Sequence, residues 1–158
     1  DCLLSRGLGD VYKRQMKYHF NEGAFDVPEY LDDRTVNVLA PQLGSAGLTI
    51  AITRDPLEGD ESLQQFVDRQ LKDLGRQVTK LEKGPQRPAR LGGGNSAIEG
   101  FSFGVNYKQQ GKLVHHIQAV FPMTPLRKVL SVTFSSPVAF TQENLQTVER
   151  VLTSFENY

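Results

Sequence analysis

The sequence has little of several features that mark common classes of protein. Cys2 is the only cysteine among the 158 residues, which excludes a disulfide framework and a thiolate metal site. Lys and Arg together number 18, as do Asp and Glu, so no global field attracts nucleic acid or an anionic membrane. No uninterrupted apolar run reaches the length of about 20 residues that crosses a bilayer. We therefore expect neither nucleic-acid binding nor direct membrane insertion.

Residues 1–15, DCLLSRGLGDVYKRQ, differ in character from the rest of the chain. They end directly before Met16, and the segment 10–15 is similar to translated sequencing-adapter DNA. We predict a non-native or disordered extension here, without which the formal net charge of the chain changes from 0 to about −1. The remaining residues, 16–158, suit a single domain. A chain starting at Met16 has no signal peptide, because Lys17 and His19 interrupt any apolar core, so we expect the cytoplasm.

Residues 33–59 contain the two predicted strands on which the rest of the fold prediction depends. Residues 35–39 and 48–53 are two runs rich in β-branched residues, separated by a segment that contains Gly and Pro, and this pattern is typical of two strands. Val36 and Val38 point to one side and Leu39 to the other. A sheet with one solvated face alternates apolar and polar residues, so this sheet is expected to need cover on both faces. The sequence Arg54-Asp55-Pro56 is expected to end the second strand.

Two helices and several further strands follow from hydrophobic periodicity. Apolar residues at three- and four-residue spacing predict one helix from near Asp60 to Gly75 and another after the N-cap Thr141. Strands are predicted over residues 17–20, 24–27, 77–83, 97–107, 113–121 and 128–135, with a turn-rich segment over 84–88. The predicted fold class is α+β: a largely antiparallel twisted sheet with one early and one C-terminal helix.

Small and hydrogen-bonding residues form a second pattern within these strands. We expect them to face away from the aromatic rows of these strands, such as the row of Phe101 and Phe103, joined by Val36, Val38 and Ala51. They are Ser102, Gly104, Asn106, Gln118, Ser131 and Thr133. Small side chains allow close backbone approach, and amides and hydroxyls bond across helix interfaces, as in packing between membrane helices. The alternative interpretation is an ordinary solvated sheet face.

Chemistry that would indicate an enzyme is absent or weak. The Gly92-Gly93-Gly94 run lacks the Lys-Ser/Thr that a phosphate-binding loop needs, so it is interpreted as a turn. His115 and His116 are adjacent on a strand and point to opposite faces, so they cannot chelate one metal ion together. No serine has the context of a nucleophile elbow. We therefore predict no catalytic residues, no metal site and no cofactor.

The ordered set of motifs in the first half of the chain resembles the DcrB-like domain family. The matching segments read NEGAFDVPEYLDDRTVNV and TIAITRDPLEGDESLQQFVDRQL. More narrowly, the chain resembles the Eag class of chaperones for type VI secretion effectors, and the resemblance extends from Met16 to the C-terminus. DcrB proteins themselves carry a secretion signal, so its expected absence favours the cytoplasmic chaperone branch.

This resemblance implies a homodimeric, cytoplasmic chaperone or adaptor. It would shield the hydrophobic N-terminal transmembrane helices of an effector of the PAAR or Rhs type before loading on the secretion spike. The client-binding positions carried over from the family are Val36, Val38, Ala51, Gln70, Leu74, Val78 and Gln118. Leu74 replaces what is often a smaller residue. The competing hypothesis is a general protein-interaction module of Mog1-like or PsbP-like shape that binds a folded partner.

Overall fold

The computed structural model describes residues 14–157, which divide into two compact units, one ending at Arg34 and the other beginning at Thr35. The first unit is a hairpin of β1 (Gln15–Phe20) and β2 (Gly23–Pro28), paired in antiparallel register with Phe20 opposite Gly23. The rings of Phe20 and Phe25 stack at a centroid distance of 4.9 Å. Arg14 and Gln15, at the end of the predicted extension, take part in this hairpin, and the rest of that extension lies outside the described residues.

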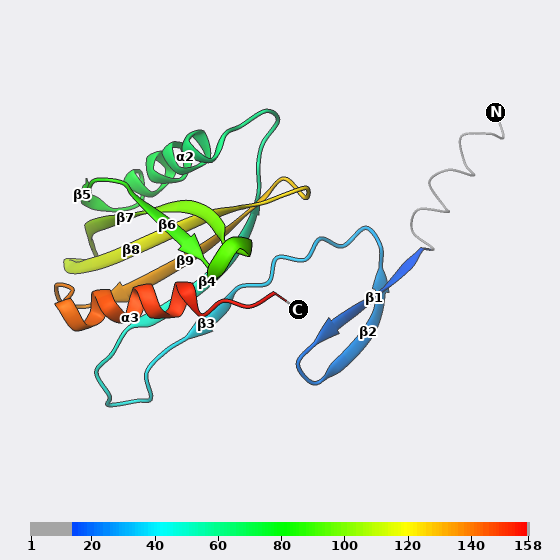
Figure 1. Cartoon of the computed structure of the whole chain (residues 1–158), viewed down its shortest axis with the longest axis horizontal. Coiled ribbons are helices and arrows are strands. Elements are labelled where there is room, and N and C mark those ends of the chain that lie inside the picture. Colours follow the sequence, from blue (N-terminus) through cyan, green and yellow to red (C-terminus); the bar gives the residue numbers. More distant parts are fainter. Residues whose placement is uncertain (1–13, 158) are drawn as a thin grey trace. The chain divides into compact units, whose positions relative to one another are not determined.

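The second unit is built on a seven-stranded antiparallel sheet (Figure 1). Its path runs β3-β4-β9-β8-β7-β5, and β6 pairs with β7 beside β5. The strands are β3 (Asn37–Leu39), β4 (Thr49–Pro56), β5 (Thr79–Lys83), β6 (Arg87–Leu91), β7 (Ile98–Gln109), β8 (Lys112–Met123) and β9 (Lys128–Ser136). A short 3₁₀ turn, η1 (Gly94–Ser96), joins β6 to β7.

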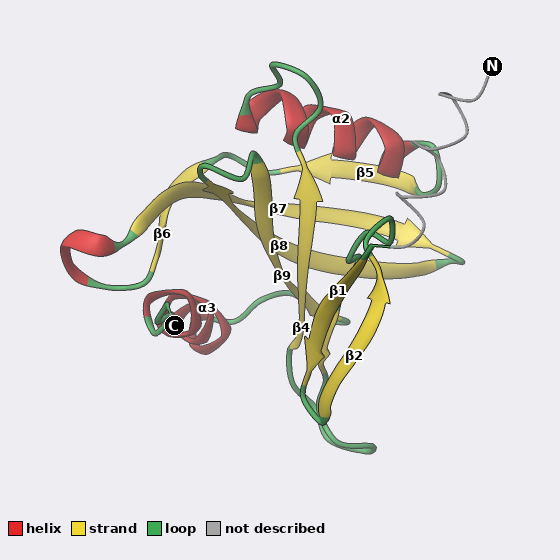
Figure 2. Ribbon diagram, turned by 90° about the vertical axis from the view of Figure 1, so that its right-hand side faces the viewer, coloured by secondary structure: helices red, strands yellow, loops and turns green. Residues whose placement is uncertain are grey.

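The two helices lie on opposite sides of this sheet, as both views of the chain show (Figures 1 and 2). Helix α2 (Leu63–Gly75) begins at the N-cap Ser62, whose hydroxyl accepts from the backbone N–H of Gln65. Helix α3 (Gln142–Thr153) begins in the same way at Thr141, with Asn144 completing the reciprocal pair. Such capping boxes satisfy backbone donors that the first turn of a helix leaves free. The predicted α+β class, with one early and one C-terminal helix, is confirmed.

Each helix packs its apolar stripe into a separate core. Phe66 and Val67 of α2 pack with residues of β7, β8 and β9 that include Phe103 and Val120. Val148 and Leu152 of α3 pack on the other side with a larger set from β4, β6, β8 and β9. That set includes Ile50, Ile52, Leu91, Phe121, Val132 and Phe134.

Two expectations about strands are wrong, and in both cases edge position explains why. The segment 84–88 was expected to be only turn, but β6 starts at Arg87 and pairs Pro88 with Phe101. The strand β4 was expected to stop before Pro56, yet it continues and pairs Pro56 with Lys128. Proline removes one ladder donor, which an edge strand tolerates. The strand β6 has one neighbour, and β3 pairs only with residues Ile50–Ile52 of β4, so both prolines lie along an edge.

Candidate functional site

Antiparallel register decides which predicted residues share a face of the sheet. Val38 pairs with Ala51, Ala51 with Thr133, Thr133 with Gln118, and Gln118 with Phe103. Directly paired residues point to the same side, so these five form one row across β3, β4, β9, β8 and β7. Because Phe103 packs against α2, the row lies on the side that carries this helix. We call this side the α2 face and the opposite side the α3 face.

The part of the α2 face beyond the helix is lined by small, uncharged side chains. Val38 is 60 % exposed, whereas the threonines and Ala51 beside it are half-buried. None of these residues belongs to the core cluster under α2. We call this area the small-residue surface; it consists of Val38, Thr49, Ala51, Thr53, Gln118, Thr133 and Ser135. Asp55, paired with Val129, places a carboxyl only at the end of β4.

Gln70 and Gln118 join the helix to this surface. The side-chain amide of Gln118 donates to the Gln70 carbonyl oxygen at 3.2 Å, across 48 positions of sequence. Both side chains are half-buried. The bond leaves the Gln70 amide as a donor and the Gln118 carbonyl oxygen as an acceptor. The pair can therefore offer both kinds of hydrogen-bonding group at the border between helix and sheet.

The remaining predicted binding residues occupy different environments. Val36 lies just before β3 and is 54 % exposed. Leu74 is half-buried and packs against the core under α2, and Val78 is itself a member of that core at 9 % exposure. The structure thus brings Val38, Ala51, Gln70 and Gln118 together and places Val78 in the interior.

The expected arrangement of the small and polar residues is wrong in one respect. Gln118, Ser131 and Thr133 share the α2 face with the aromatic row, whereas Ser102, Gly104 and Asn106 lie on the α3 face. The prediction treated the strands as one pattern, but the β7–β8 register pairs Phe103 with Gln118. Each face also carries a helix of its own. The small-residue surface is therefore the part of a face that its helix leaves uncovered.

Ser131 lies next to this surface but is not part of it. It is 2 % exposed, and its hydroxyl has no hydrogen-bond partner among residues 14–157. Its neighbours along β9 and β8 are Val129 and Val120, both members of the core under α2. A buried hydroxyl without a partner destabilises a fold, so Ser131 marks the border between the packed and the open part of the α2 face.

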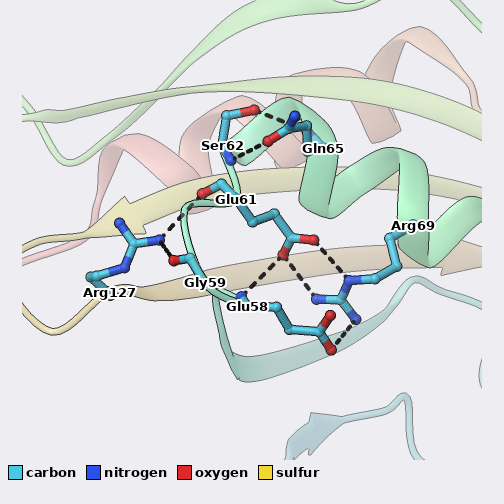
Figure 3. Close-up of polar contacts among 7 residues, drawn as sticks. All are labelled: Glu58, Gly59, Glu61, Ser62, Gln65, Arg69 and Arg127. Carbon is cyan, nitrogen blue, oxygen red and sulfur yellow. Dashed lines mark hydrogen bonds and ion pairs between the residues drawn. The ribbon is translucent and has the colours of Figure 1, made fainter.

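A polar network holds the start of α2, the helix that borders the small-residue surface (Figure 3). Arg69 donates from Nε and Nη2 to the two carboxylate oxygens of Glu61, each at 2.9 Å, and lies 3.4 Å from a carboxylate oxygen of Glu58. Arg127, in the turn between β8 and β9, donates to the backbone carbonyl of Gly59. The Arg69 hydrogen bond lowers the pKa of Glu61 below its ordinary value. Paired arginine–carboxylate bonds set orientation as well as energy, so the network holds α2 at a defined position over the sheet.

His116 of β8 is a titratable group on the α2 face, paired with Ser135 of the small-residue surface. Its ring meets the Tyr107 ring edge to face, with centroids 5.1 Å apart, and its Nε2 lies 3.4 Å from the Tyr107 hydroxyl. Burial lowers the pKa of His116 below its usual value and raises the pKa of Tyr107. Both groups are therefore neutral near pH 7 and add no charge to this face there.

The α3 face contains a cavity that sequence reasoning missed. Its volume is about 810 Å³, and it lies between β6, α3 and the floor that β7 and β8 form. Two signals in the sequence pointed toward it: the small residues Ser102 and Gly104 alternate with the aromatic row, and Leu145 belongs to the apolar stripe of α3. These residues enclose a cavity only because β6 forms its second wall, and β6 was not predicted.

No group of three or more His, Cys, Asp or Glu side chains among residues 14–157 is arranged to hold a metal ion. Within the same residues, no helix has the length and apolar character needed to span a membrane.

Comparison with known proteins gives both a structural and a family relationship. A solved structure of PA94 from Pseudomonas aeruginosa, described as a protein of unknown function, superposes with a TM-score of 0.61 at 20 % identity. The match covers 86 % of this chain and 89 % of that one, and it supports the fold alone. No curated protein matches the sequence. The family model for DcrB matches residues 22–154, and the chain therefore belongs to the DcrB family.

Proposed function

We propose that the protein is a cytoplasmic chaperone or adaptor that shields the N-terminal transmembrane helices of a type VI secretion effector of the PAAR or Rhs type until it is loaded on the spike. The observation that carries this proposal is the row Val38–Ala51–Thr133–Gln118, an uncharged strip across four strands beside α2. Small residues allow a helix backbone to approach closely, as they do between helices in membranes.

The energetics favour a client that is apolar with occasional polar groups. Exposing a transmembrane helix to water costs about 25 cal/mol of free energy for every Å² of apolar surface. Covering one side of the helix with the small-residue surface removes part of that cost. The Gln70–Gln118 pair offers a donor and an acceptor to polar client atoms. Each such bond contributes about 0.5–1.5 kcal/mol net.

A homodimer would enlarge this surface. The strand β3 has β4 as its hydrogen-bonded neighbour in the sheet, and its three residues are exposed. Free strand edges attract another chain, so a second copy is a fitting partner for this edge. Light scattering of the purified protein would test the dimer.

The chaperone proposal is tested with two variants of one strand. Val38 and Leu39 are both 60 % exposed, but Val38 lies on the α2 face and Leu39, paired with Ile50, on the α3 face. The chain is co-expressed with the N-terminal segment of the effector encoded beside it, and co-purified effector is quantified. We expect Val38→Asp to reduce recovery at least tenfold, because it buries a charge against the client, and Leu39→Asp to leave it unchanged.

Equal effects of the two variants would contradict the assignment of the client to the α2 face. An effector that is equally soluble and secreted without this protein would contradict the chaperone role itself. Binding of a folded partner through Val38, with no affinity for hydrophobic peptides, would support the alternative of a general interaction module.

A further inference from the structure

The cavity on the α3 face lies on the opposite side of the sheet from the proposed client surface. Its floor comes from residues of β7 and β8 that include Gly104 and Ile117, one wall from α3, and the other from β6. Its volume of about 810 Å³ falls in the range of about 300–1,000 Å³ that is typical of small-molecule sites. The floor backbone is already paired within the sheet, so an added strand would find no free partners there.

Two glycines on β7 show where this face is closed and where it is open. A Cβ atom on Gly100 would lie 2.0 Å from the Val120 carbonyl oxygen and 2.7 Å from the Phe121 ring. A Cβ on Gly104, four residues along the same strand, would have the His116 carbonyl oxygen at 3.9 Å as its nearest neighbour. The face is thus tightly packed at Gly100 and has room for added atoms at Gly104.

The walls of the cavity combine apolar area with an unpaired cation. Phe140 and Leu145 line it, and Leu145 is 41 % exposed although it belongs to the apolar stripe of α3. Arg87 also lines it, is exposed, and forms no side-chain hydrogen bond or ion pair with any described residue. An apolar body with a negative head group would satisfy both features.

The other charged and polar groups around the cavity leave Arg87 as the cation available to a head group. Arg87 pairs with Ser102 and lies on the α3 face, whereas Arg90 pairs with Glu99 on the α2 face and donates to the Gly94 carbonyl oxygen at 2.8 Å. Glu149 places one carboxylate on the α3 wall. At the floor, His115 Nδ1 lies 3.0 Å from the Asn106 side-chain oxygen, so these two polar groups pair with each other. Arg87 is the group left for an anion.

We propose that this cavity binds a small carboxylate amphiphile, with the carboxylate on Arg87 and the apolar chain over Gly104, Ile117, Phe140 and Leu145. A guanidinium binds a carboxylate through two parallel hydrogen bonds, and the apolar chain leaves water for the lining of the cavity. The site is independent of the proposed chaperone surface, because the two lie on opposite faces.

The test uses isothermal titration calorimetry of the full chain with decanoate and with decylammonium, which have the same apolar chain and opposite charge. We expect saturable binding of one decanoate, at least tenfold tighter than decylammonium. Arg87→Gln should remove this preference. Gly104→Val, which fills the floor, should weaken decanoate binding at least tenfold, and the exposed-position variant Leu145→Gln should weaken it severalfold.

Matched controls make each result decisive. The melting temperature of each variant is measured first, and Leu145→Gln serves if Gly104→Val does not fold. Val38→Asp, on the other face, should leave decanoate binding unchanged. The proposal is overturned if decanoate shows no saturable binding, if decylammonium binds equally well, if the folded cavity variants bind like the wild type, or if Val38→Asp alone abolishes binding.

Discussion

The α2 face and the α3 face of the sheet are each covered by one helix, but over different strands. Helix α2 packs over the aromatic residues of β7, and the β3–β4–β9 part of its face remains as the small-residue surface. Helix α3 packs over the aliphatic and aromatic residues of β4, β8 and β9, and its face opens at Gly104 on β7. The two open areas therefore lie at opposite ends of the sheet and on opposite sides.

The difference between these areas follows from side-chain size. On β4 and β9 the α2 face carries Ala51, Thr53 and Thr133, which do not reach far enough to build a core. On the same strands the α3 face carries Ile52, Val132 and Phe134, which do. Over this stretch the two strands build a core on the α3 side and carry only small side chains on the α2 side.

The largest expected effect is on the packed side. Phe121 is 0 % exposed in the core under α3, and Phe121→Ala should lower the free energy of unfolding by about 3–5 kcal/mol, because it removes apolar burial and leaves a cavity. Thr133→Ala, on the small-residue surface, should change it by less than about 0.5 kcal/mol. Chemical denaturation of the two variants compares the sides directly, and equal losses would show that the small-residue surface is also a packed core.

A second comparison separates the closed from the open part of the α3 face. Gly100→Ala should lower the free energy of unfolding by about 1–3 kcal/mol, because the new methyl group collides with backbone and the strands must move apart. Gly104→Ala should have little effect, since its Cβ meets nothing closer than 3.9 Å. Thermal melts of both variants measure this. Similar melting temperatures would mean that the face is uniform and that the cavity is closed by side-chain movement.

At the border of the α2 face the expected change is smaller and has the opposite sign. Ser131→Ala removes a buried hydroxyl that has no hydrogen-bond partner among the described residues and should raise the free energy of unfolding by about 1 kcal/mol. Urea denaturation would detect the increase. A clear loss of stability would instead indicate that the hydroxyl is hydrogen-bonded in solution.

The smallest effect is a pH dependence from His116. Burial lowers its pKa in the folded chain, so the unfolded chain binds more protons as the pH falls below the usual value of about 6.5. Its contribution to stability is complete above that pH and is lost as the pH falls through the lower folded pKa. His116→Phe should flatten this part of the stability profile. Identical pH profiles for the variant and the wild type would contradict burial of His116 as the cause.

Local sequence patterns were sufficient to predict most of the elements. The stripe from Leu63 to Leu74 and the cap at Thr141 predict α2 and α3, and the alternation of Phe101 and Phe103 with small residues predicts β7. These signals depend on neighbours within a few positions, where backbone geometry alone decides which side chains meet. The strand β6 was missed because Pro88 is a breaker in the interior of a sheet and is tolerated at its edge.

The candidate site was predicted only in part, because membership of a face depends on register. Val38 and Ala51 were expected on the binding side, and they share it with Gln118. The pairing of β7 with β8 decides the rest. It places Gln118 beside the aromatic row, and it places Ser102 and Asn106 on the opposite face. A shift of one residue reverses every side chain of a strand, and no local pattern reports such a shift.

The sequence by itself determined the helices, most of the strands and the uncharged character of the residues that form the small-residue surface, because each follows from the order of side chains along the chain. Only the tertiary structure decided that Gln70 meets Gln118 across 48 positions, that Val78 is interior, and that β6 and α3 enclose a cavity with Arg87. Those outcomes depend on strand order and helix placement. Both are fixed by the simultaneous burial of two apolar cores, one on each face of a shared sheet.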